Sequence, residues 1–193
     1  MFKKNLFHGT EEQNLENIEK NGFIYKQRDN HWLGQGIYFF EDKKQAINWK
    51  TRNSKVVLEV TIELPFSEIL DLDSIDGIEF FMNEVKEILQ TSEIKIEIKE
   101  DELNVNRCFF LDIIKNKNKN INMIKYTFQI SDPMYDKRNL KELQAIVPFG
   151  LVHNQLQYCL HKNEYIIEKK VIYREQPDST KKVLSKRKSF KGW

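Results

Sequence analysis

Runs typical of β-strands lie toward both ends of this 193-residue chain, and runs typical of helices lie in its middle. Such segregation favours an α+β fold with a mainly antiparallel sheet over a regular βαβ alternation. The last two strand runs are either two strands or one long strand with a bulge near Lys162–Asn163. The expected strands are 2–8, 36–40, 55–64, 121–130, 143–149, 155–161 and 165–173, and the expected central helices are 75–91, broken early by Gly77, and 102–116.

Two shorter helices are expected in the first quarter of the chain. Thr10 is predicted to cap the first, with Gln13 completing a capping box, and Asn21-Gly22 to end it. Asp42 is predicted to cap a second helix that runs to about Arg52.

Composition limits the class of protein. No run approaches the roughly 20 apolar residues that span a bilayer, and "MFKKNLFHGTEEQ" has no apolar secretion-signal core, so a cytoplasmic protein without membrane contact is expected. Cys108 and Cys159 fit a reducing compartment, although counting alone leaves one disulfide open. Neither cysteine lies in a Cys-x-x-Cys pair and the four histidines lack zinc spacing, so no metal site is expected.

The net charge of +2 conceals a basic C-terminus. The last fourteen residues, "TKKVLSKRKSFKGW", carry six of the 31 basic residues and no acid, which leaves 25 basic against 29 acidic residues elsewhere. A basic tail on a mildly acidic body indicates either contact with a polyanion such as nucleic acid or a solvated tail.

Two short motifs carry chemistry only in combination. "LFHGT" ends a strand with a histidine and a glycine, where backbone can approach a ligand, but alone it also describes an ordinary strand-to-helix turn. "HWLGQGIYFF" lacks both the third glycine of a dinucleotide fingerprint and the Gly-Lys-Ser/Thr of a phosphate loop. Gly34 and Gly36 are expected to take backbone angles closed to other residues, which would aim Tyr38 inward.

In this order the motifs resemble the catalytic domain of poly(ADP-ribose) polymerase-like ADP-ribosyltransferases, in a bacterial or phage form. The similar blocks are His8-Gly9-Thr10, Asn14, Ile18, Gly22-Phe23, Gly34-Gln35-Gly36-Ile37-Tyr38-Phe39 and Trp49. The similarity is strong over residues 5–64 and much weaker over 65–150. It implies a split β-sandwich in a catalytic domain spanning 1–176, with a helical insertion at 65–120 and a basic tail at 177–193.

The resemblance also implies a site for NAD, used as a substrate. His8 would hydrogen-bond a ribose hydroxyl, and the backbone of Gly9 would meet the nicotinamide carboxamide. Tyr38 would stack on one face of the nicotinamide ring and Trp49 on the other, since both offer a large π face. Ala46 falls where many members have a serine that contacts the carboxamide. Thr10 and Gly36 complete the implied cofactor-binding set.

The third catalytic position has two candidates. The family commonly places a glutamate at the start of a later strand, where it binds the ribose and stabilises an oxocarbenium-like transition state. Glu164 matches an Asn-Glu-Tyr-Ile strand start, whereas Gln157 matches relatives whose strand begins with glutamine. Gln157 can donate and accept hydrogen bonds but is no base.

The implied activity is cleavage of the nicotinamide–ribose bond and transfer of a single ADP-ribose to nucleic acid or protein, as in a toxin or defence effector. An antitoxin would then be a further partner. Two alternatives stay open at this point: an inactive module that binds NAD, ADP-ribose or RNA, and an NAD glycohydrolase. His31, Trp32, His153 and His161 lie near the motifs and are secondary candidates for the site.

Overall fold

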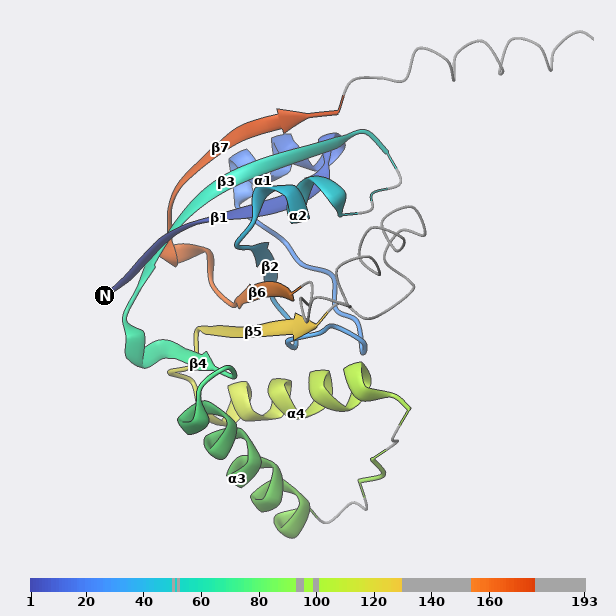
Figure 1. Ribbon diagram of the computed structural model, residues 1–193, viewed down its shortest axis with the longest axis vertical. Coiled ribbons are helices and arrows are strands. Elements are labelled where there is room, and N and C mark those ends of the chain that lie inside the picture. Colours follow the sequence, from blue (N-terminus) through green and yellow to red (C-terminus); the bar gives the residue numbers. More distant parts are fainter. Residues whose placement is uncertain (50, 52, 93–95, 99–100, 130–153, 176–193) are drawn as a thin grey trace, which may run out of the picture.

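The computed structural model describes residues 1–49, 51, 53–92, 96–98, 101–129 and 154–175. These residues form an α+β fold around one seven-stranded sheet with the order β4-β5-β6-β2-β1-β3-β7 (Figure 1). Five of its six strand pairings are antiparallel, and β4 pairs with β5 in parallel. The strands are β1 (Phe2–Glu11), β2 (Ile37–Phe40), β3 (Lys55–Leu64), β4 (Ile69–Asp71), β5 (Met123–Gln129), β6 (Asn154–Leu160) and β7 (Ile166–Arg174).

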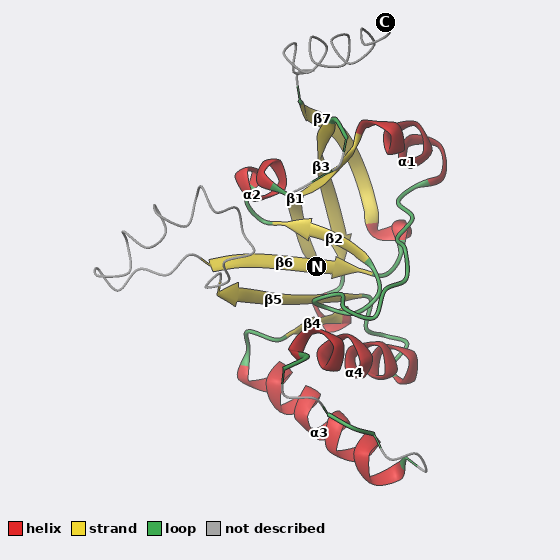
Figure 2. Ribbon diagram, turned by 90° about the vertical axis from the view of Figure 1, so that its right-hand side faces the viewer, coloured by secondary structure: helices red, strands yellow, loops and turns green. Residues whose placement is uncertain are grey.

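The sheet consists of two halves that are barely joined. β1 and β3 pair along their whole length, from Phe2 opposite Leu64 to Glu11 opposite Lys55. By contrast, β1 and β2 share the single register pair Phe7 and Phe40. In Figure 2, β3 and β7 run across the direction of β5 and β6. The part of β1 that follows Phe7 and the part of β2 that precedes Phe40 are therefore not paired with each other.

The described residues contain four α-helices: α1 (Leu15–Asn21), α2 (Lys43–Asn48), α3 (Ile75–Thr91) and α4 (Leu103–Lys117). The largest buried cluster joins the two halves and includes Leu6, Phe39 and Tyr158. A second cluster lies under α4, and a third, small one lies under α2. Because successive strand residues face opposite sides, β2 sends Phe39 to the first cluster and Tyr38 to the second.

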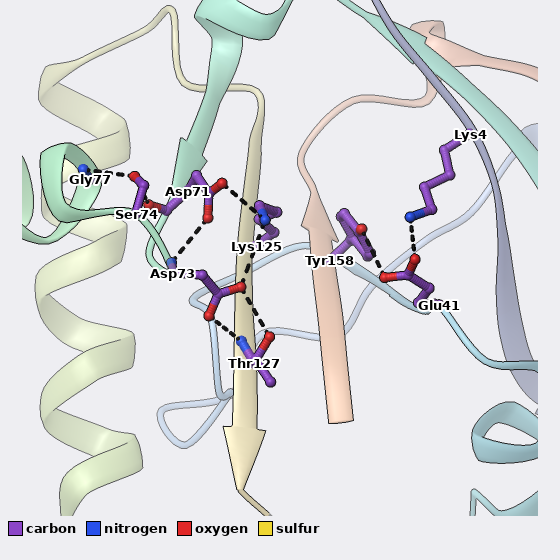
Figure 3. A network of polar contacts seen from close by, with 9 residues as sticks. All are labelled: Lys4, Glu41, Asp71, Asp73, Ser74, Gly77, Lys125, Thr127 and Tyr158. Carbon is purple, nitrogen blue, oxygen red and sulfur yellow. Dashed lines mark hydrogen bonds and ion pairs between the residues drawn. The ribbon is translucent and has the colours of Figure 1, made fainter. Parts of the chain in front are cut away.

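Polar contacts at the end of β4 hold the start of α3 (Figure 3). Asp71 pairs with Lys125 at 2.9 Å, and the Ser74 hydroxyl accepts a 3.0 Å bond from the Gly77 amide as the N-cap of α3. A Cβ on Gly77 would lie 1.8 Å from the Asp71 carbonyl oxygen. Gly77 therefore permits α3 to begin against β4, and the helix continues through it without the expected break.

Most sequence-based element predictions are confirmed, with a few exceptions among the described residues. The Thr10 capping box is wrong, because β1 continues to Glu11 and a short 3-10 turn follows before α1. The second helix ends at Asn48 rather than near Arg52. β6 and β7 are two strands, separated by a turn at Asn163–Tyr165. The predicted loop 131–142, the strand 143–149 and the basic tail lie outside the described residues.

Within the described residues, no helix combines the length and apolar character needed to cross a bilayer. Cys108 and Cys159 are both buried and both free, so the disulfide that counting left open is not formed.

Candidate functional site

The His-Gly motif and the Gly-x-Gly-Ile-Tyr-Phe motif meet where β1 and β2 part. His8 donates from Nδ1 to the backbone carbonyl of Tyr38, at 2.8 Å. Because a carbonyl can only accept, the proton is assigned to Nδ1, which leaves Nε2 as an acceptor. Burial lowers the pKa of His8, and the bond to the carbonyl raises it by less, so the imidazole is neutral at neutral pH.

The rings around His8 hold it in place. Its centroid lies 4.9 Å from that of Phe23 and 5.7 Å from that of Phe39, in edge and tilted contacts. Among the described residues, no hydrogen bond reaches Nε2. The sequence thus positions one neutral acceptor atom at the parting of the two strands.

The Tyr38 side chain lies on the other face of β2. Its ring packs with the cluster under α4, and its hydroxyl accepts from the Leu33 amide at 2.6 Å and donates to the Gly34 carbonyl at 2.8 Å. Burial raises the pKa of Tyr38 above its ordinary value. His8 and Tyr38 are therefore linked through the Tyr38 backbone, while their side chains occupy opposite faces and the phenol stays protonated.

Helix α2 covers the face of the sheet on which Tyr38 lies. A Cβ on Gly9 would meet the Ala46 carbonyl oxygen at 2.5 Å and the Trp49 Cβ at 3.5 Å, so the close approach of α2 requires glycine there. Ala46 is fully buried. Trp49 is 42% exposed, and its ring packs on Phe40 with centroids 5.7 Å apart. The exposed indole of Trp49 therefore lies beside Gly9. Among the described contacts, it does not stack on the Tyr38 ring.

The two glycines before β2 serve different purposes. Gly34 has a positive φ of 76°, as expected of a residue that must turn the chain. The expectation for Gly36 is wrong, because its φ is not positive. It is needed for space instead, since a Cβ there would lie 2.4 Å from the Cys159 Sγ and 2.8 Å from the Leu160 carbonyl oxygen.

Helix α4 holds this glycine loop from outside. Arg107 donates from Nε to the Trp32 carbonyl at 2.5 Å, and the Gln35 amide donates to Asp112 at 2.7 Å. The Arg107 guanidinium also lies over the ring of Phe128, 4.9 Å from its centroid. Reasoning from sequence missed Arg107 and Asp112, since neither belongs to a motif and both are far from the loop along the chain.

Thr10 is buried on β1, and its hydroxyl accepts from the Asn14 side-chain amide at 3.0 Å. His31 contacts the Tyr38 ring edge-on at 5.5 Å, and its Nδ1 is buried without a partner. Trp32 packs on Phe128, and His153 lies outside the described residues.

The two candidates for the third catalytic position lie in the middle of β6 and in the turn that follows it. Gln157 is buried and pairs with Phe40, which puts its side chain on the face of Tyr38 and Trp49. Glu164 lies in the turn after β6, with its carboxylate 64% exposed and 3.6 Å from Lys162. That turn docks on α1 and its loop, because Asn163 forms two 2.9 Å bonds with the Phe23 backbone. The fold puts Gln157, but not Glu164, on the face of β2 and β6 that carries Tyr38.

Two hollows lie elsewhere on the described surface. A polar one of about 660 Å³ lies between the glycine loop and α4, where Arg28, Gln35 and Lys115 line it. An apolar one of about 520 Å³ lies between α3 and α4. Neither includes His8, Tyr38 or Gln157. Among the residues described, no cluster of three or more His, Cys, Asp or Glu side chains is arranged to hold a metal ion.

Comparison with known proteins finds a distant relative. The chain is 26% identical over 151 residues to the uncharacterized protein MJ0359 of Methanocaldococcus jannaschii, a match that covers 71% of this chain and 70% of the relative. No model of a known protein family matches the chain.

Proposed function

We propose that the protein is an NAD-dependent ADP-ribosyltransferase. The observation that carries the proposal is the bond from His8 to the Tyr38 carbonyl at the point where β1 and β2 part. The two motifs that resemble the transferase family are thirty residues apart in sequence, yet their key residues contact each other directly. In that family a split sheet clasps NAD, and an α+β fold with a sheet in two halves is consistent with such an arrangement.

The neutral contacts proposed for the nicotinamide riboside come from both faces of β2, with His8 on one and Tyr38, Trp49 and Gln157 on the other, so the ligand would have to enter where β1 and β2 part. His8 Nε2 is the acceptor for a ribose hydroxyl, and the exposed Trp49 is the face on which nicotinamide stacks. Gly9 lies beside Trp49, so its backbone is the group that meets the carboxamide. The buried methyl of Ala46 supplies no hydroxyl there. Tyr38 contributes its ring rather than its hydroxyl, which the loop already binds on both sides.

Gln157 is the third residue of the proposed site. Its face and its pairing with Phe40 favour it over the exposed Glu164. In the reaction the nicotinamide–ribose bond breaks and nicotinamide leaves with the bonding pair. The acceptor then attacks C1 of the ribose and loses its proton. An uncharged amide stabilises the cationic sugar less than a carboxylate and removes no proton. The proposal therefore favours an acceptor that is already a good nucleophile, on nucleic acid or protein.

One observation favours a second candidate, an NAD-binding module without turnover. The nearest carboxylate after β2 is Glu41, and it is already engaged by Lys4 and by the Tyr158 hydroxyl (Figure 3). A site without a free carboxylate can bind NAD and still fail to cleave it.

The test is release of nicotinamide from NAD, with single-stranded DNA, RNA or protein as acceptor, alongside calorimetric NAD binding. His8→Asn keeps a donor for the Tyr38 carbonyl but leaves no acceptor at the position of Nε2, because the shorter amide does not reach it, so it should abolish release in a folded protein. Gln157→Ala should reduce nicotinamide release as strongly as His8→Asn. Glu164→Ala is the matched control and should release nicotinamide at the normal rate. Binding without release in the wild type supports the module, and release without a labelled acceptor supports a glycohydrolase. Failure to bind NAD rejects the proposal.

A further inference from the structure

Helix α3 carries an apolar stripe that the rest of the described chain leaves mostly uncovered. Its members recur three and four residues apart, as in the a and d positions of a coiled coil. Four of them are exposed by between 40% and 76% of their surface, and the fifth, Val85, is half-buried. The stripe consists of Ile75, Ile78, Met82, Val85 and Leu89.

The side of α3 that contacts the rest of the molecule borders the stripe. Gly77 and Ile88 are its buried residues, and Ile88 packs with Phe110 and Ile114 of α4. Val85 packs partly against the same cluster, so it lies at the boundary between that side and the stripe. In Figures 1 and 2, α3 lies at the rim of the molecule beyond α4, where a second body can reach it. The stripe is therefore open along a helix about 25 Å long.

We propose that a second copy of this chain covers the stripe, with the two α3 helices antiparallel about a two-fold axis. Placing Met82 opposite Val85 of the second copy also places Ile78 opposite Leu89, because four residues back on one helix match four residues forward on the other. The two-fold axis repeats both residue pairs, so the same patch of each copy forms both sides of the interface. A closed two-fold dimer follows without further surfaces.

Charged residues at the edge of the stripe favour a second copy as the partner and an antiparallel arrangement of the two helices. Glu79 and Lys86 are seven residues apart, so they flank the stripe on one edge. Both are exposed, and no ion pair within the described residues involves either. In the antiparallel dimer, Glu79 of each copy lies within about 3 Å along the axis of Lys86 of the other. Two oppositely charged pairs form, whereas in a parallel two-fold dimer the charged edges of the two helices lie on opposite sides of the seam and these pairs cannot form.

The charge of α3 argues against a membrane as the occupant. The helix contains four acidic residues, Asp76, Glu79, Glu84 and Glu87, and a single lysine, Lys86. Helices that lie on anionic lipid carry lysine and arginine on the polar face instead. The dimer stands independently of the proposed function, because α3 shares no residue with the proposed NAD site.

The experiment is sedimentation of the full chain from roughly 1 to 200 µM, for the wild type and for charge variants of α3. The wild type should sediment as a dimer at the upper concentrations. E79K and K86E should each weaken the dimer at least about fivefold, because each turns two attractive pairs into two repulsive ones. The double variant E79K/K86E should restore it, and so should an equimolar mixture of the two single variants. Circular dichroism confirms that each variant is folded.

Met82→Glu is the second probe, since it buries a charge at the centre of the interface and should give monomers. A wild type that stays monomeric throughout overturns the proposal, as does a dimer that Met82→Glu leaves intact. A dimer whose strength ignores the charge variants refutes the antiparallel arrangement. Floating the wild type with anionic vesicles would identify lipid as the occupant instead.

Discussion

His161 should make the protein sensitive to mild acid. It follows β6 and donates from Nδ1 to the Gln35 carbonyl at 3.0 Å, while its Nε2 is buried without a partner. Burial lowers its pKa to about 4, and the positive charge of Lys115 adds to the effect. Between about pH 6.5 and pH 4 the unfolded chain therefore binds a proton that the folded protein does not. The folded state loses stability as the pH falls through this range.

The pKa difference sets the size of the effect. With an unfolded pKa of 6.5 and a folded pKa of about 4, His161 alone lowers the free energy of unfolding by about 2 kcal/mol between pH 7.5 and pH 5. His161→Asn keeps a donor for the Gln35 carbonyl but does not titrate. Its free energy of unfolding should fall by about 2 kcal/mol less than that of the wild type over the same interval.

Urea unfolding at pH 7.5 and pH 5 measures both changes. His8 and His31 also have pKa values lowered by burial, so both proteins should lose some stability in acid, and only the difference reports on His161. Equal losses in the wild type and in His161→Asn would refute the reasoning, because His161 would then be as hydrated in the folded protein as in the unfolded chain.

Substitutions at three further positions test the site. Gly36→Ala should lower the free energy of unfolding by about 3 kcal/mol, because the new methyl would lie 2.4 Å from the Cys159 Sγ; a urea-measured loss under about 1 kcal/mol would contradict that packing. Asp112→Ala removes the acceptor for the Gln35 amide and should cost about 1–3 kcal/mol, with faster hydrogen exchange at Gln35. Asp112→Asn keeps an acceptor oxygen and should lose much less; unchanged exchange in the alanine variant would show that α4 does not hold the loop. If NAD stacks on the indole, Trp49→Ala should weaken its binding roughly tenfold by calorimetry and Trp49→Phe far less, and equal affinities would remove Trp49 from the site.

The sequence determined the secondary structure well where a pattern was local. The alternation of "KVVLEVTIEL" predicts β3 residue for residue, and Asn21-Gly22 marks the end of α1 correctly, with Gly22 at a φ of 78°. Asp42 caps α2 as expected, by accepting from the Lys44 amide. Such features succeed because the residues that form them are neighbours along the chain.

Tertiary structure decided the features that join distant segments. Thr10 has the side chain of a helix cap, but pairing with β3 extends β1 through it, since ten backbone partners outweigh one cap. Gly36 is glycine because Cys159 packs against it, and Gly77 because β4 ends beneath it. No pattern near either glycine reveals those partners.

The candidate site divides in the same way. Sequence alone selected His8, Gly9, Tyr38, Ala46, Trp49 and both possible third residues, because each belongs to a short motif. Only the fold separates Gln157 from Glu164, since the pairing of β6 with β2 decides which of them faces Tyr38. Only the fold shows that His8 forms a hydrogen bond with the Tyr38 carbonyl, and that Arg107 and Asp112 form hydrogen bonds with the backbone of the glycine loop. A motif specifies the groups that can react, whereas strand pairing and helix packing fix which of them meet, because tertiary contacts join residues up to 162 positions apart.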